Sequence, residues 1–96
     1  MHHRYYVYII SNRYRTVFYT GMTNDLERRI WEHKSGVGSN FTTGYRVTDL
    51  LYYEEFSQVK EAISREKQLK RWGRQKKLDL IHTLNPEMVD LADQLW

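Results

Sequence analysis

The sequence contains no cysteine among its 96 residues and only one proline. Without cysteine there are no disulfides, no thiolate metal ligands and no cysteine nucleophile, which fits a reducing cytoplasm. No stretch is long and apolar enough to cross a membrane, and the residues from Met1 to Arg4 show no apolar leader. We therefore expect a cytoplasmic chain without a membrane partner, folded as a single domain over residues 1–96.

Acidic residues are scarce in one part of the chain. The segment from Lys60 to Lys77 holds eight lysines and arginines but only two glutamates, whereas the residues after it include four acids and no lysine or arginine. A concentrated positive block favours a polyanionic partner such as nucleic acid. Its alternative is an ordinary solvated helix face, which is the commoner meaning of a charge run taken alone.

The hydrophobic periodicity predicts two strands, a helix, a third strand and three further helices. We place them at residues 4–11, 16–22, 25–35, 49–56, 58–72, 74–83 and from 86 onward. The first strand is aromatic and β-branched throughout, which predicts a central strand buried on both faces. A long loop is expected from Gly36 to about Thr48, and long loops are often functional.

Local signals refine these elements. Asn24 followed by Glu27 is typical of a helix N-cap with a capping box, and Ser57 is expected to cap the helix after the third strand. Gly21, near the end of the second strand, predicts a bulge, a bend or a close approach of the backbone to a ligand. Asn85 before Pro86 predicts the start of a last amphipathic helix, whose apolar face would contain Met88, Leu91 and Leu95.

Glu66 interrupts the apolar face of the fifth element. That face otherwise consists of Val59, Ala62, Ile63, Leu69 and Trp72. A carboxylate on such a face is either a metal ligand or a rim residue paired with Lys70 one turn later, and periodicity alone favours the pair. A lone carboxylate suits Mg²⁺ or Mn²⁺, which keep several waters and accept substrate phosphate as a further ligand.

The helix after the second strand carries Arg29 and His33 one turn apart, and Leu26, Ile30 and His33 form its core face. Arg29 offers a planar fork of donors that suits a phosphate, and His33 could move a proton. The plainer alternatives are a surface arginine paired with Glu32 or Glu27, and a half-buried helix histidine. Tyrosines crowd the first hairpin, and one of them could act as a base if positive charge lowered its pKa.

Together these residues resemble the GIY-YIG nuclease superfamily. Tyr6-Val7-Tyr8 and Tyr19-Thr20-Gly21 are similar to the two half-motifs that name the family, and Arg29 and His33 stand where its catalytic arginine and histidine stand. Glu66, four residues after Ala62, matches the metal-binding glutamate. The run from Arg65 to Trp72 resembles the small standalone bacterial branch, the UPF0213 (YhbQ-like) group.

The resemblance implies an α/β domain of the α+β type, with a three-stranded antiparallel sheet flanked by helices. It implies a metal-dependent endonuclease that hydrolyses phosphodiester bonds, in DNA more than in RNA, with low sequence specificity or in structure-directed repair or recombination. A partner protein could supply specificity. One Mg²⁺ or Mn²⁺ would bind Glu66, while Tyr8, Tyr19, Arg29 and His33 would be catalytic and converge with it on one concave face. Backbone contacts would come from Arg65, Lys67, Lys70, Arg71, Arg74, Lys76 and Lys77.

The sequence departs from the family pattern at three places. Tyr6 replaces the glycine of the first half-motif, Thr20 the isoleucine of the second, and Met22 a lysine that some members carry. Asn85 is a candidate for the family's late asparagine. Two other functions remain open: a non-catalytic nucleic-acid-binding module that keeps the fold, and a protein-interaction domain that docks through an acidic C-terminal helix.

Overall fold

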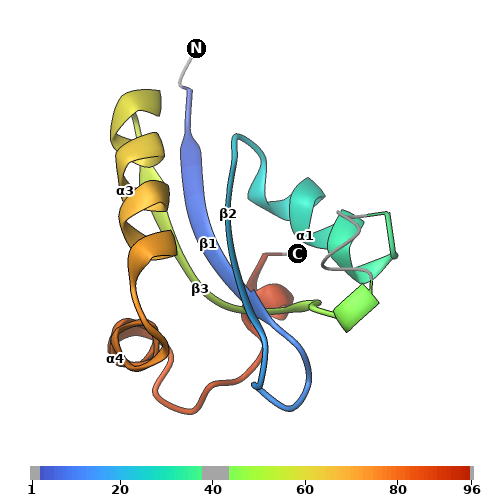
Figure 1. Ribbon diagram of the computed structural model, residues 1–96. Helices are drawn as coiled ribbons and strands as arrows, with labels where there is room; N and C mark the ends of the chain where they lie inside the picture. The colour runs from blue at the N-terminus through green and yellow to red at the C-terminus, as the bar shows by residue number, and fades with distance from the viewer. Residues whose placement is uncertain (1–2, 38–43, 96) are drawn as a thin grey trace.

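The computed structural model describes residues 3–37 and 44–95 (Figure 1). Its elements are β1 (Tyr5–Ser11), β2 (Phe18–Thr23), α1 (Leu26–Lys34), β3 (Asp49–Phe56), α3 (Val59–Arg71), α4 (Arg74–Leu84) and the 3-10 helix η1 (Leu91–Gln94). The predicted α+β class and the order of the first six elements are confirmed, with boundaries within two residues of prediction. Part of the predicted loop from Gly36 to Thr48 lies outside the described residues.

β1 is the central strand of the sheet, as its composition predicts. It pairs antiparallel with β2 on one side and with β3 on the other, so the strand order is β2-β1-β3. Residues Val7 to Ser11 are all buried. Because successive side chains point to opposite faces, a strand covered on both faces needs apolar residues at consecutive positions.

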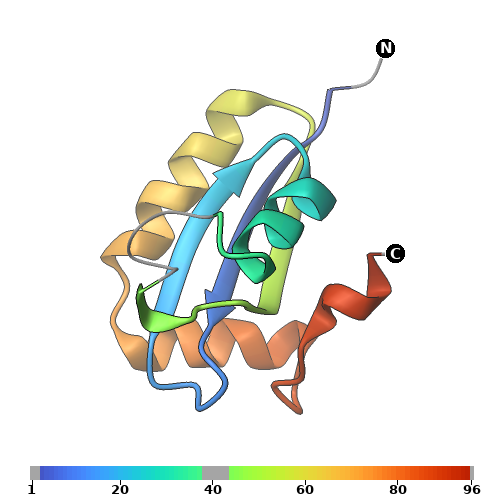
Figure 2. The same ribbon diagram turned by 90° about the vertical axis from the view of Figure 1, so that its right-hand side faces the viewer.

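Different parts of the chain cover the two faces of this sheet. Figures 1 and 2 show α1 on one side, with α3 and α4 on the other. The α1 side is packed around Tyr8, Ile10, Leu26, Ile30, Val47, Leu50, Leu91 and Ala92. The α3 side is packed around Val7, Ile9, Leu51, Tyr52, Ala62, Leu69 and Ile81. The alternation along β1 therefore sends Tyr8 towards α1 and its neighbours Val7 and Ile9 towards α3.

The helix starts differ from prediction by one residue. Asp25, not Asn24, is the N-cap of α1, and its carboxylate accepts a hydrogen bond from the Arg28 amide at 3.1 Å. The hydroxyl of Thr23 binds the amide and the carbonyl of Asp25, which carries the chain one residue further before the helix begins. At α3 the N-cap is Gln58 rather than Ser57, and it makes no side-chain capping bond.

The predicted apolar face of α3 is narrower than expected. Ala62 and Leu69 are fully buried, whereas Val59 and Ile63 remain 40% and 36% exposed. Small Ala62 lets the helix approach the sheet closely, so only residues along the Ala62–Leu69 line reach the core. Among the described residues, no helix has the length and apolar character needed to cross a bilayer.

The prediction of a last amphipathic helix from residue 86 onward is wrong. Asn85 is the C-cap of α4, and its buried amide bonds to the backbone of Leu51 and Val89 instead of opening a new helix. Met88 has a positive φ of 55°, and the next regular structure is the short η1. These side-chain bonds satisfy a turn that competes with a helix, so the acidic helix proposed as a docking surface does not form.

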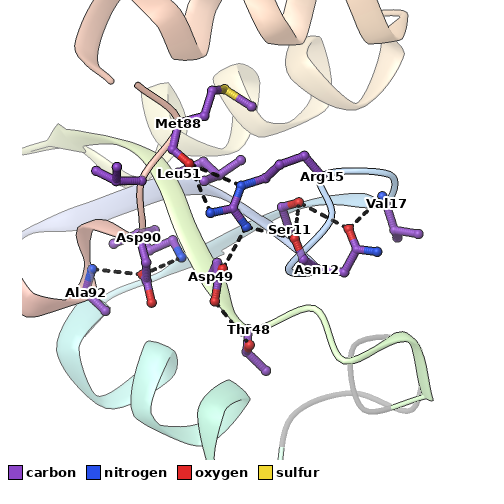
Figure 3. A network of polar contacts seen from close by, with 12 residues as sticks. Ser11, Asn12, Arg15, Val17, Thr48, Asp49, Leu51, Met88, Asp90 and Ala92 are labelled. Atoms are coloured by element: carbon purple, nitrogen blue, oxygen red, sulfur yellow. Dashed lines mark hydrogen bonds and ion pairs between the residues drawn. The ribbon is translucent and has the colours of Figure 1, made fainter. Parts of the chain in front are cut away.

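The C-terminal segment is instead bound to the rest of the fold by polar side chains (Figure 3). One carboxylate oxygen of Asp90 accepts hydrogen bonds from the amides of Leu50 and Ala92, both at 3.0 Å. Its other oxygen pairs with Lys34 at the end of α1. Arg15 of the β1–β2 hairpin binds Asp49 at 2.7 Å and the carbonyl of Met88. The segment therefore braces α1 against the sheet.

Candidate active site at the edge strand

Gly21 and Tyr8 define the centre of the candidate site. They are register partners on β2 and β1, and a Cβ built on Gly21 would lie 2.4 Å from the Tyr8 hydroxyl oxygen and 2.5 Å from Cζ. The Tyr8 ring therefore lies against the backbone of edge strand β2, where only glycine leaves room. The sequence predicts a bulge, a bend or a close approach to a ligand at Gly21; the structure has a close approach, but to the Tyr8 side chain and not to a ligand.

α1 places His33 against the same ring. His33 is buried at 3% exposure, and its Nε2 lies 3.2 Å from the Tyr8 hydroxyl. Its ring also contacts Tyr19, with ring centroids 6.1 Å apart. The helical spacing of Leu26, Ile30 and His33 turns all three towards the sheet, as predicted. Tyr8, Tyr19 and His33 thus form one aromatic cluster between β1, β2 and α1.

Burial sets the protonation states of Tyr8 and His33. It raises the pKa of Tyr8 to about 12, against the opposing effect of Arg29. It lowers the pKa of His33 to about 4, and the positive charge of Arg29 acts in the same direction. Both groups are therefore neutral near pH 7, and the Tyr8 hydroxyl can donate to Nε2 when the imidazole proton is on Nδ1.

Arg29 supplies a positive charge beside the aromatic cluster. Its guanidinium is half-buried and bonds to Glu32, one turn along α1, at 3.0 Å. Burial acts against its charge, but the interactions with Glu32 and Tyr8 raise its pKa above the ordinary value. The predicted pairing with Glu32 is therefore real, and it coexists with a position close to Tyr8.

Glu66 approaches from the other layer. α3 contacts β2 and β1 on the face opposite to α1. The negative charge of Glu66 nevertheless contributes to the raised pKa of Tyr8, so the carboxylate acts electrostatically on the tyrosine from the other layer. The five predicted residues do not share one face of the sheet. Four lie on the α1 side and Glu66 on the α3 side, and the effect of Glu66 on the pKa of Tyr8 connects the two sets.

The donor set fits a hard divalent ion with few protein ligands. Glu66 is half-buried, with 22% of its side chain exposed. Within residues 3–37 and 44–95, no group of three or more His, Cys, Asp or Glu side chains could enclose a metal. A single carboxylate oxygen donor is compatible with Mg²⁺ or Mn²⁺ that retains waters, and it does not suit zinc.

The predicted backbone contacts fall into two groups. Arg65 binds both carboxylate oxygens of Glu54, at 2.9 and 2.8 Å, and lies over the Trp72 ring. Arg74 bonds to backbone carbonyls of the β1–β2 hairpin and lies over Phe18. Both arginines therefore hold parts of the fold together. Arg74 is nevertheless exposed, as are Lys67, Lys70, Arg71 and Lys76, while Lys77 is half-buried.

Three further positions have roles that the sequence did not reveal. Met22, at the position of a lysine in some relatives, packs into the core on the α3 side. Asn85 uses both ends of its amide in the turn described above, which is a structural task. Thr20 is buried, and its hydroxyl has no hydrogen-bond partner among the residues that the structure describes. Only the substitution of a threonine for the family's isoleucine could have drawn attention to Thr20.

Comparison with known proteins shows the family to which this chain belongs. Residues 4–79 match the family model described as the GIY-YIG catalytic domain. The chain therefore belongs to the GIY-YIG family, whose members are nucleases that generally use a divalent metal and act on nucleic acid.

The relatives narrow this to the UPF0213 group, as the motifs predict. A UPF0213 protein of Staphylococcus saprophyticus is 40% identical over 78 residues, which cover 81% of this chain and 94% of that protein. One from Haloquadratum walsbyi is 39% identical, covering 83% and 89%. The solution NMR structure of UPF0213 protein BH0048 from Bacillus halodurans is similar with a TM-score of 0.58 and 33% identity, over 88% of each chain.

Proposed function

We propose that this protein is a metal-dependent endonuclease that hydrolyses phosphodiester bonds in DNA, with low sequence specificity or with selection for DNA structure. The observation that carries the proposal is the cluster at the edge of β2. It brings a buried tyrosine–histidine pair, a half-buried arginine and, from the opposite layer, a carboxylate within electrostatic reach of one another. These are a proton-handling pair, a phosphate-binding cation and a metal-binding group.

Arg29 is assigned to the scissile phosphate. Its planar fork can bind two phosphate oxygens and gains strength as negative charge grows in the transition state. A phosphate there would compete with Glu32, which occupies the guanidinium in this structure. Arg29 is therefore held ready in position by a partner on its own helix.

Tyr8 and His33 are assigned to the proton of the attacking water. Tyr8 is protonated at neutral pH, so it can accept a proton only after passing its own to His33 Nε2, 3.2 Å away. The resulting imidazolium would lie beside Arg29, which is unfavourable until a phosphate supplies negative charge. The relay is therefore favoured when substrate is bound. Tyr19, more exposed than Tyr8 and in contact with His33, is assigned to orienting the water.

Glu66 is assigned to one Mg²⁺ or Mn²⁺. When bound, such an ion would neutralise negative charge on the phosphate and on the leaving oxygen. Binding along the DNA backbone is assigned to the exposed cations of α3 and α4, chiefly Lys67, Lys70, Arg71 and Lys76.

The test is cleavage of supercoiled, nicked and branched DNA, beside an RNA duplex, in Mg²⁺ or Mn²⁺. Tyr8→Phe should reduce the rate about 100- to 10,000-fold, as expected for loss of acid–base catalysis. Arg29→Ala and Glu66→Ala should abolish it, whereas Tyr6→Phe, on the same strand but bonded to Glu55, should not. Equal cleavage by wild type and all site variants would overturn the proposal. Faster cleavage of branched DNA would identify repair or recombination intermediates as substrates.

A second candidate is a nucleic-acid-binding module without catalysis. The exposed cations favour it, as does the presence of a same-helix partner on both Arg29 and Glu66. It predicts binding that weakens steeply with salt and no cleavage by any variant in either metal.

A further inference from the structure

The predicted metal ligand already has a cation beside it. Lys70 Nζ lies 3.5 Å from a carboxylate oxygen of Glu66, one turn further along α3. The lysine side chain is 51% exposed and the glutamate 22% exposed, so Lys70 can leave the pair without disturbing the core. A glutamate followed by a lysine four residues later is the favourable orientation for such a pair.

Lys70 also has a second charged neighbour, on α4. Its positive charge reaches Lys77, whose pKa is lowered by burial and then by Lys70. Lys77 forms no ion pair with any residue that the structure describes. Lys70 therefore has a like-charged group on α4 and an oppositely charged partner, Glu66, on its own helix.

We propose that Lys70 is an internal counter-ion of the metal site, which pairs with Glu66 in the free protein and, once a divalent cation takes that carboxylate, binds a DNA phosphate next to the one that is cleaved. This proposal rests on the function proposed above, because it requires Glu66 to bind metal. It makes metal binding and backbone binding depend on each other through one side chain.

Competition for Glu66 gives the first test, which needs neither DNA nor cleavage. Mg²⁺ would be titrated into the protein while the amide chemical shifts of residues 64–72 are followed by NMR. Lys70→Met retains helix propensity but removes the competitor, so Mg²⁺ should bind about 2- to 5-fold more tightly, the equivalent of an exposed ion pair. Lys67→Met removes the same charge from the same helix without breaking the pair, and should tighten binding much less.

The outcomes separate the two proposals. Equal effects of Lys70→Met and Lys67→Met would overturn the counter-ion role while leaving the metal site in place. If Glu66→Gln binds Mg²⁺ as wild type does, the metal site itself is wrong and the proposed function fails with it.

The transfer of Lys70 to phosphate gives the second test. Duplex affinity would be measured at several salt concentrations with and without Ca²⁺, a hard cation that also prefers oxygen ligands. With Ca²⁺, Lys70→Met should reduce the salt dependence by about one phosphate contact. Without Ca²⁺, it should leave that dependence unchanged, because Glu66 then holds the lysine. An equal reduction under both conditions would show that Lys70 contacts DNA independently of metal, and would overturn the proposed exchange.

Discussion

At the scale of single residues, the contact between Tyr8 and Gly21 connects the sheet to the candidate chemistry. The tyrosine ring lies against the β2 backbone, and its hydroxyl then reaches His33. A glycine in an edge strand would otherwise weaken the strand. Here the lost strand propensity is offset by the position that the ring gains.

Gly21→Ala tests this contact. A methyl group 2.4 Å from the hydroxyl oxygen must displace the ring, so we expect a loss of about 1–3 kcal/mol in the free energy of unfolding and a broken Tyr8–His33 bond. Gly44→Ala is the control, because a Cβ there meets nothing within 4 Å. Urea denaturation would measure both. A Gly21→Ala protein as stable as the Gly44→Ala protein would show that the ring is free to move.

Thr20, between Tyr19 and Gly21, carries a buried hydroxyl that is not satisfied by a hydrogen bond among the described residues. It pairs with Ile9, so its side chain faces the core on the α3 side, where its hydroxyl finds no hydrogen-bond partner within residues 3–37 and 44–95. Thr20→Val should raise the free energy of unfolding by about 1 kcal/mol, because the same shape is kept without an unsatisfied polar group. Thr23→Val, which removes a hydroxyl bonded to Asp25, should lower it. A destabilised Thr20→Val would indicate an unrecognised partner for the hydroxyl.

At the scale of elements, α1 carries two of the five candidate site residues. Arg29 and His33 both lie on this nine-residue helix, and its core face fixes the direction in which they point. Such a short helix depends on its ends and on its packing. Asp25 caps the start, and Lys34 is held by Asp90 of the C-terminal segment at the other end.

The position of the cap is directly testable. Asp25→Ala should lower the free energy of unfolding by about 1 kcal/mol, since it leaves an amide of the first turn unsatisfied. Asn24→Ala should change it by less than about half of that, because Asn24 is exposed outside the cap. Thermal denaturation of the two variants would compare them. A larger loss of stability for Asn24→Ala than for Asp25→Ala would support the capping box predicted from the sequence.

Elements with strong periodicity were predictable and those with competing turns were not. β1, β3 and α3 have unambiguous patterns, and their predicted ranges agree with the structure to within one residue. The C-terminal helix failed because Asn85 bonds to Leu51, a contact between residues far apart in the chain. Likewise, the place of Glu66 in an apolar face singled it out, but its electrostatic effect on Tyr8 depends on how the two layers pack on the sheet.

At the scale of the whole molecule, the candidate site takes its residues from both layers on the sheet, whose buried core clusters have no residue in common. The α1 layer holds a neutral histidine in a buried position, and the α3 layer holds the carboxylate. Keeping His33 neutral makes the stability of the entire fold depend on pH. Its folded pKa of about 4 lies below the ordinary 6.5, so its contribution is complete above pH 6.5 and is lost as the pH falls towards 4.

The expected result is a stability difference between pH 7.5 and pH 5. In urea denaturation, His33 should account for a loss of about 1–2 kcal/mol over that interval, because the unfolded chain gains a proton that the folded chain resists. His33→Gln should remove this part of the pH dependence. His82→Gln, which changes an exposed histidine, should retain it. Identical pH dependence in the two variants would mean that His33 is accessible to protons in the folded state.

The most direct test of the account is the metal dependence of DNA cleavage by matched carboxylate variants on α3. The rate of nicking of a supercoiled plasmid would be measured against Mg²⁺ and Mn²⁺ concentration for wild type, Glu66→Gln and Glu61→Gln. Glu61 is exposed in the first turn of the same helix, so its variant controls for loss of one negative charge. We expect saturable, metal-dependent cleavage by wild type and Glu61→Gln, with a loss of at least about 100-fold for Glu66→Gln, equivalent to about 2.7 kcal/mol. Cleavage by Glu66→Gln with the metal dependence of wild type would contradict the account.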